Sequence, residues 1–127
     1  MDDEAAVQVY RAFIDGCVGV ARTEVSAERI RRHGHTERNN EAALPLDQNE
    51  EARKSLLLQL DPAQREVIAG LLEDCRRAAI HDLLAHLEWL MTCDGFKMSW
   101  KGVDICSPET LHHDFIGRAA GYPWGRA

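Results

Sequence analysis

The chain has 127 residues, of which 45% are hydrophobic and 28% are charged, and these fractions exclude a disordered or fibrous protein. Its length suits a single helical domain spanning 1–127. The net charge of −6 argues against nucleic acid or an anionic membrane as a partner, because affinity for phosphates depends on an excess of Lys and Arg.

The first residues and the cysteines predict the compartment. The opening Met1-Asp2-Asp3-Glu4 lacks the features of a secretory signal, and no stretch approaches about 18 consecutive apolar residues. We therefore expect a cytoplasmic protein without a membrane segment. The cysteines are widely scattered and, in a reducing compartment, are expected to be small buried hydrophobes: Cys17, Cys75, Cys93 and Cys106.

Two helices are predicted in the first half of the chain. The segment 5–21 carries apolar residues at helical spacing, and acidic residues precede it. The segment 22–40 is polar, with acidic and basic side chains interleaved, which predicts a solvated helix face or a loop. A second helix is predicted over 48–60, opened by a capping box formed by Asp47 and Glu50.

A long third helix is predicted to follow at once. Asp61 can cap it, Pro62 suits its first position, and Gln64 completes another capping box. The helical pattern then continues over 62–92 and stops before Gly95. This length exceeds the usual range of a helix in a globular protein.

The apolar stripe of this long helix changes sides along its length. One face is predicted from Val67, Ile68, Leu71, Leu72, Cys75 and Ala79. A second face, rotated by roughly a third of a turn, is predicted from Leu83, Leu84, Leu87, Leu90 and Met91. Either the helix breaks near Arg76 and Arg77, or one continuous helix serves two surfaces.

The C-terminal third changes period. Alternating apolar and polar residues over 96–105 predict a short β-hairpin that turns at Gly102. A final helix is predicted to open at Ser107 and Pro108. The aromatic tail over 122–124 is expected to pack back on the body or, alternatively, to dock a partner. The predicted fold is mainly α, a single-domain bundle of four to five helices with a short hairpin between the long third helix and the C-terminal helix.

Asp82 and His86 lie four residues apart within the apolar run 79–91, where a helix is expected to bury its side chains. Buried polar groups without partners cost roughly 1 to 3 kcal/mol. The pair is therefore expected to bond to each other or to a ligand, or to be less buried than the pattern indicates.

One interpretation of this pair is a divalent transition-metal site, for example for zinc. The ligands would come from the long helix and the final helix: Asp82, His86, His112 and His113. His81 is not expected to join them, because it lies about 140° around the helix from His86. The other interpretation needs no cofactor: Asp82 bonds His86, and the polar residues of the final helix face water.

Two main functions follow from these patterns. The first is a small non-enzymatic binding or regulatory protein that forms a homo-oligomer, specifically a homodimer, through the apolar segment 83–91, and that can also bind another protein. The second is a metal-dependent, hydrolase-like enzyme that uses the Asp/His cluster. A third interpretation is a small-ligand pocket lined by Trp89, Phe96, Met98 and Trp100.

Overall fold

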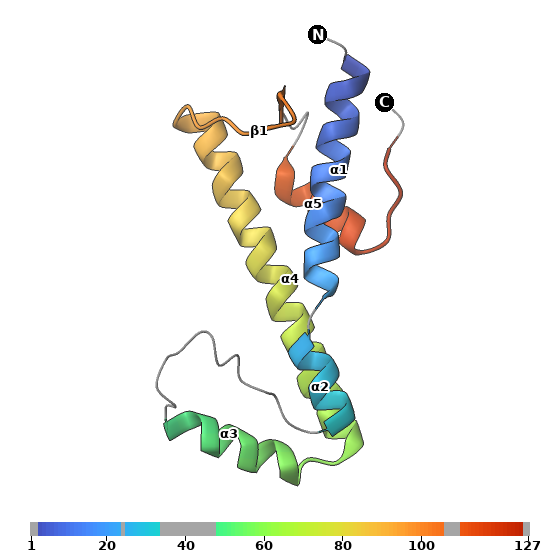
Figure 1. The fold of residues 1–127 in the computed structure, drawn as a ribbon, viewed down its shortest axis with the longest axis vertical. Coiled ribbons are helices and arrows are strands. Elements are labelled where there is room, and N and C mark those ends of the chain that lie inside the picture. The colour runs from blue at the N-terminus through green and yellow to red at the C-terminus, as the bar shows by residue number, and fades with distance from the viewer. Residues whose placement is uncertain (1–2, 24, 34–47, 106–109, 126–127) are drawn as a thin grey trace. The chain divides into compact units, whose positions relative to one another are not determined.

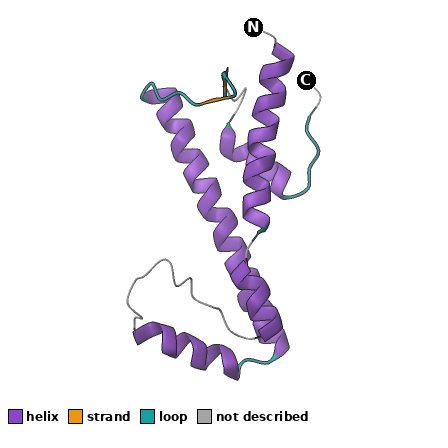
Figure 2. Cartoon of the chain, in the orientation of Figure 1, coloured by secondary structure: helices purple, strands orange, loops and turns teal. Residues whose placement is uncertain are grey.

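The computed structural model describes residues 3–23, 25–33, 48–105 and 110–125. These residues form a mainly helical fold with one β-hairpin between the longest helix and the C-terminal helix, as the sequence predicts (Figures 1 and 2). The elements in chain order are α1 (Asp3–Arg22), α2 (Val25–His33), α3 (Gln48–Gln59), α4 (Pro62–Cys93), β1 (Ser99–Trp100), β2 (Val103–Asp104) and α5 (Leu111–Ala119).

Residue contacts divide the chain into two compact units, one formed by Met1–Thr23 with Arg76–Ala127 and the other by Glu24–Cys75. The single domain over 1–127 stays a prediction. None of the described helices combines the length and the apolar character that a membrane crossing requires.

The core of the first unit is built on α1. Its buried residues recur every three or four positions, so they form one stripe along the helix. Helix α5 packs against this stripe, while Leu84 of α4 and Ile105, which directly follows β2, add further buried side chains. The fully or nearly fully buried core residues are Tyr10, Ile14, Val18, Ala21, Leu84, Ile105, Leu111 and Phe115.

Both ends of α4 form as the sequence predicts. The backbone N–H of Asp61 donates to Gln64 Oε1 at 3.0 Å, and the N–H of Gln64 donates to Asp61 Oδ1 at 2.8 Å, which is a reciprocal capping box. At the other end, the N–H of Phe96 donates to the carbonyl of Leu90 at 3.1 Å, and Gly95 has a φ of +69°. This left-handed glycine closes a Schellman motif.

Helix α4 is continuous over Pro62–Cys93, so of the two alternatives, a break near Arg76 or one continuous helix, the structure shows the second. The first predicted apolar face is not fully buried, because Val67 and Leu71 are 63% and 54% exposed. In the first unit, the side of α4 that packs on the core carries Ile80, Leu84, Leu87 and Met91. Periodicity finds an apolar stripe, whereas the neighbouring helices determine which stripe is buried.

The hairpin has the predicted turn. Trp100 pairs with Val103 and Ser99 with Asp104, which leaves Lys101 and Gly102 as a two-residue loop. Both loop residues have positive φ values, 54° and 76°. Two successive residues in this region define the type I′ turn that suits the twist of a hairpin.

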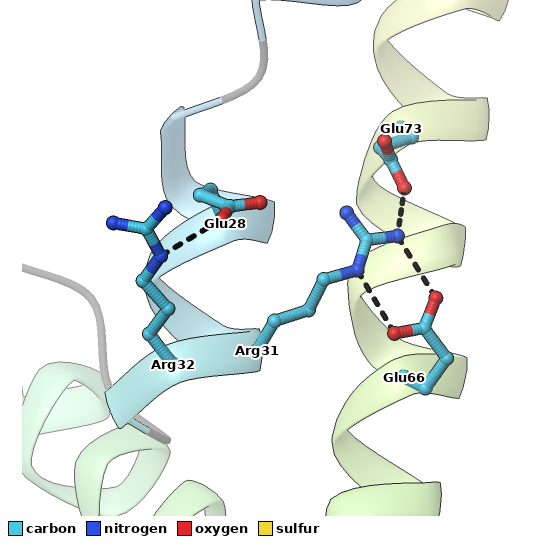
Figure 3. Close-up of polar contacts among 5 residues, drawn as sticks. All are labelled: Glu28, Arg31, Arg32, Glu66 and Glu73. Atoms are coloured by element: carbon cyan, nitrogen blue, oxygen red, sulfur yellow. Dashed lines mark hydrogen bonds and ion pairs between the residues drawn. The ribbon is translucent and has the colours of Figure 1, made fainter.

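In the second unit, α2 forms within the segment for which the sequence left a helix face or a loop open. The guanidinium of Arg31 pairs with Glu66 at 2.9 Å and also with Glu73, both on α4 (Figure 3). On α2 itself, Arg32 pairs with Glu28 at 2.9 Å. Among the residues of this unit that the structure describes, the buried hydrophobic ones are Ala27, Ile30, Leu57 and Ala69. The predicted caps of α3 at Asp47 and of the final helix at Ser107 and Pro108 lie outside the described residues.

The α1 core generates a stability prediction. Replacing the fully buried Ile14 with alanine should lower the free energy of unfolding by about 2 to 5 kcal/mol, through lost burial and the cavity left behind. Val20→Ala is the matched control on the same helix, where the side chain is largely exposed, and its effect should stay within about 1 kcal/mol. Urea denaturation of both variants measures the difference, and equal losses would contradict the assigned core.

Candidate functional site

The structure places Asp82 and His86 on the exposed side of α4. The Asp82 side chain is 81% exposed, and His86 is exposed as well. Leu84, two residues from each of them, is only 3% exposed and points into the core. On a helix, residues two apart face nearly opposite directions, so burying Leu84 turns both polar side chains outward. Of the alternatives that the sequence left open, the structure therefore supports the one in which the pair is less buried than the apolar pattern indicates.

The two side chains also have different neighbours. His81 Nδ1 lies 3.1 Å from Asp82 Oδ1, so Asp82 bonds its sequence neighbour instead of His86. The His86 ring stacks on Trp89, with ring centroids 6.4 Å apart and an interplanar angle of 11°. The predicted direct bond between Asp82 and His86 is thus replaced by two separate contacts.

A histidine cluster does form, with His81 in place of His86. The ring centroids of His81 and His112 are 5.3 Å apart in an edge-on arrangement, and those of His112 and His113 are 4.5 Å apart. The sequence pattern excluded His81 because of its angle to His86 around α4. His81 instead contacts His112 at the start of α5, and such a contact between two helices cannot be predicted from the spacing of residues along one of them.

His112 is the most constrained member of this histidine cluster. Its Nδ1 atom is buried and has no hydrogen-bond partner among the described residues. Burial lowers the pKa of His112 below its ordinary value, and the neighbouring His113 and His81 lower it further, while Glu88 acts in the opposite direction. The structure therefore favours a neutral imidazole at this position.

Glu88 of α4 holds the beginning of α5. Its Oε2 accepts a hydrogen bond at 3.2 Å from the backbone N–H of Leu111, the first residue of the helix. The N-cap residue Thr110 makes no side-chain capping bond. A carboxylate from another helix thus satisfies one of the first N–H groups of α5, which have no partner within the helix.

The predicted metal ligands are only partly brought together. His112 and His113 are neighbours, whereas Asp82 bonds His81 and His86 turns to Trp89. Within the described ranges, no three His, Cys, Asp or Glu side chains are grouped so as to hold a metal ion.

A second polar network ties the C-terminal tail to α1, and no sequence pattern indicates it apart from the aromatic residues of the tail. Arg118 Nε donates to Asp15 Oδ1 at 2.8 Å, and the indole N–H of Trp124 donates to Asp15 Oδ2 at 3.1 Å. The guanidinium groups of Arg11 and Arg118 lie 5.3 Å and 5.2 Å from the centre of the Trp124 ring. The predicted packing of the tail on the body is confirmed for Trp124, whereas Tyr122 of the same tail is 68% exposed.

One interpretation of the sequence expected all polar residues of α5 to face water, and this is wrong. Asp114 accepts a hydrogen bond from the hydroxyl of Tyr10 on α1, and His112 is half-buried, while His113 is exposed.

Beside Asp15 lies an open hollow of about 360 Å³, lined by Asp15, Val18, Gly19, Arg22, Arg118 and Gly121. It is distinct from the predicted aromatic pocket.

The exposed side of α4 also carries large apolar groups. Leu83 and Trp89 are 57% and 56% exposed and flank His86 along the helix. In the hairpin region, Phe96 and Trp100 are also exposed, and Met98 packs on the core. The aromatic residues proposed to line a small-ligand pocket therefore lie largely on the surface.

The fold and these sites define a small helical protein with a tail-anchoring network, a histidine cluster and an exposed apolar helix face. A family model described as a family of unknown function (DUF6547) matches residues 3–126, so the chain belongs to this family. No curated protein and no solved structure matches the chain.

The lowered pKa of His112 predicts a pH dependence. The folded-state pKa of His112 lies below the ordinary 6.5, so as pH decreases the imidazole becomes protonated in the unfolded chain before it does in the folded one. The free energy of unfolding should therefore fall as pH decreases from about 6.5. Denaturation at pH 7.5 and 5.5, compared between the wild type and His112→Gln, isolates this contribution. The wild type should lose more stability than the variant, and equal losses would contradict a depressed pKa.

Asp15 predicts a pH dependence at lower values. Burial would raise its pKa, but hydrogen bonds from Arg118 and Trp124, and the charges of Arg118 and Arg11, lower it below 3.8. The stabilisation is therefore present above about 3.8 and is lost as pH falls through the folded-state pKa. Because Asp15 is partly exposed and solvent screens the pair, Asp15→Asn should cost no more than about 1 kcal/mol at pH 7.

Thermal unfolding of the Asp15→Asn variant between pH 7 and pH 2.5 tests this expectation. The gap in melting temperature between wild type and variant should narrow below pH 3.8. Asp104→Asn, at an exposed position of the hairpin, serves as the control. A gap that stays constant with pH would show that the loss is not electrostatic.

Proposed function

We propose that this protein is a non-enzymatic binding or regulatory protein that associates with a second copy of itself through the exposed face of α4. The supporting observation is the exposure of Leu83 and Trp89, at 57% and 56%, on a helix whose opposite side already packs on the core. Among the described residues of this unit, only one side of α4 is covered by other elements. The exposed side is therefore available to another molecule.

Covering this face contributes favourably to association. Fully burying a side chain such as Leu contributes roughly 1.5 to 3 kcal/mol, and a two-fold interface buries each residue twice. This gain is offset by the translational and rotational entropy that two chains lose when they associate. Since each 1.4 kcal/mol changes an affinity about tenfold, removing one such residue should weaken the dimer measurably.

Charge and thiol chemistry agree with this proposal. The net charge of −6 disfavours nucleic acid as the partner. A cytoplasmic location is part of the proposal, supported by the free thiols of Cys17, Cys75 and Cys93 among the described residues. Another protein could use the same face, and its competition with self-association would regulate both.

The metal-dependent enzyme remains the alternative prediction from the sequence. The contacts give it less support, because Asp82 bonds His81 and His86 stacks on Trp89, away from a shared centre with His112. Self-association also explains why large apolar residues are exposed on α4, which a metal-dependent enzyme does not require.

Light scattering coupled to size exclusion over about 1 to 200 µM protein tests self-association. We expect the wild type to shift from monomer to dimer, and Leu83→Glu or Trp89→Glu to raise the dissociation constant at least about tenfold, since each removes apolar burial and adds a charge. Val7→Glu, at a 40% exposed position on α1, is the matched control and should leave the dimer intact. A wild type that stays monomeric throughout would contradict the proposal.

A further inference from the structure

The exposed face of α4 has the spacing of a helix-pairing seam. Its members alternate three and four residues apart, as the core positions of a two-helix coiled coil do, and every one of them is exposed. The seam, which we call the α4 seam, consists of Ala79, Asp82, His86, Trp89 and Cys93. It lies wholly within the unit that contains Arg76–Ala127.

Apolar residues border the α4 seam on both sides. Leu83 and Leu90 follow it on one side, and Ala78 and Ala85 on the other. No charged residue occupies these bordering positions. The polar groups that would meet across a pair of such helices are therefore one acid and one base.

We propose that two copies of the chain pair through the α4 seam in antiparallel orientation, about a two-fold axis level with Leu84, so that Asp82 of each copy faces His86 of the other. This inference rests on the proposed self-association and specifies its register. In a two-fold interface, a residue that meets a second residue is matched by the reverse contact. The acid and the base are thus both paired, and Trp89 meets the small Ala79 of the second copy.

The alternatives match the charges less well. In a parallel pair, Asp82 of one copy would face Asp82 of the other copy, and like charges that face each other are destabilising. Antiparallel pairs shifted by one heptad step would set Asp82 opposite Ala79 or Cys93, which leaves a carboxylate against an uncharged partner. Only the register centred on Leu84 matches acid with base.

The present contacts of both side chains are compatible with this pairing. The bond from His81 reaches Oδ1 of Asp82, and a carboxylate has a second oxygen that can accept another bond. The imidazole of His86 stacks by its face on Trp89, so its nitrogen atoms remain at the ring edge. A polar pair in a coiled-coil seam typically specifies register and oligomer state at some cost in stability.

A charge swap tests the register in the full-length chain. Asp82→Lys alone should weaken the dimer at least about fivefold by setting a cation against His86, and His86→Glu alone should weaken it by setting two acids together. The double variant restores opposite charges and should return the dissociation constant to within about threefold of the wild type. A double variant as weak as the sum of the single changes would overturn the register.

Disulfide trapping gives an independent readout. In a background where Cys75, Cys93 and Cys106 are serine, an Asp82→Cys chain mixed with a His86→Cys chain should form a linked heterodimer on mild oxidation. Each chain alone should remain unlinked, because its new thiol faces an imidazole or a carboxylate. Linked homodimers of either chain would show a parallel pair and overturn the proposal.

These outcomes separate the two levels of inference. A monomeric wild type removes both the proposed function and the register. A dimer that Leu83→Glu breaks, but that neither recovers in the charge swap nor yields the linked heterodimer, keeps the function and removes the register. Circular dichroism of each variant checks that α4 stays folded.

Discussion

The packing of one side of α4 on the core of its unit is the constraint on which the other features depend. Ile80, Leu84, Leu87 and Met91 contact the core built on α1 and α5. Once this side is buried, helical geometry turns Asp82 and His86 to the surface. The same contact brings His81 to His112 and Glu88 to the first N–H of α5. The histidine cluster and the exposed face thus have one physical origin.

The tail network shows how a small unit supplements a limited core. Asp15 accepts hydrogen bonds from a guanidinium and an indole N–H, and two arginine guanidinium groups lie close to the Trp124 ring. Charge-assisted bonds to one carboxylate are stronger than neutral ones, and they join α1, α5 and the tail. The aromatic tail is therefore part of the unit's structure, which leaves the exposed face of α4 as the better-supported binding surface.

The sequence predicted local features well where the determining groups are close in the chain. The capping box of Asp61 and Gln64, the closure at Gly95 and the two-residue turn of the hairpin are all observed. The candidate site was predicted less well. The sequence pattern indicates His112 but favours His86 over His81, because angles along one helix do not show that His112 of α5 lies next to His81 of α4.

By itself, the sequence determined that the chain is mainly helical, where α4 begins and ends, and that a hairpin separates α4 from the last helix, because caps, turns and periodicity act over a few residues. Tertiary structure alone decided which side of α4 is buried. The apolar residues of this helix are spread around much of its circumference, so several sides could be buried at similar cost. Contact with α1 and α5 selects one of them and leaves Leu83, His86 and Trp89 outside.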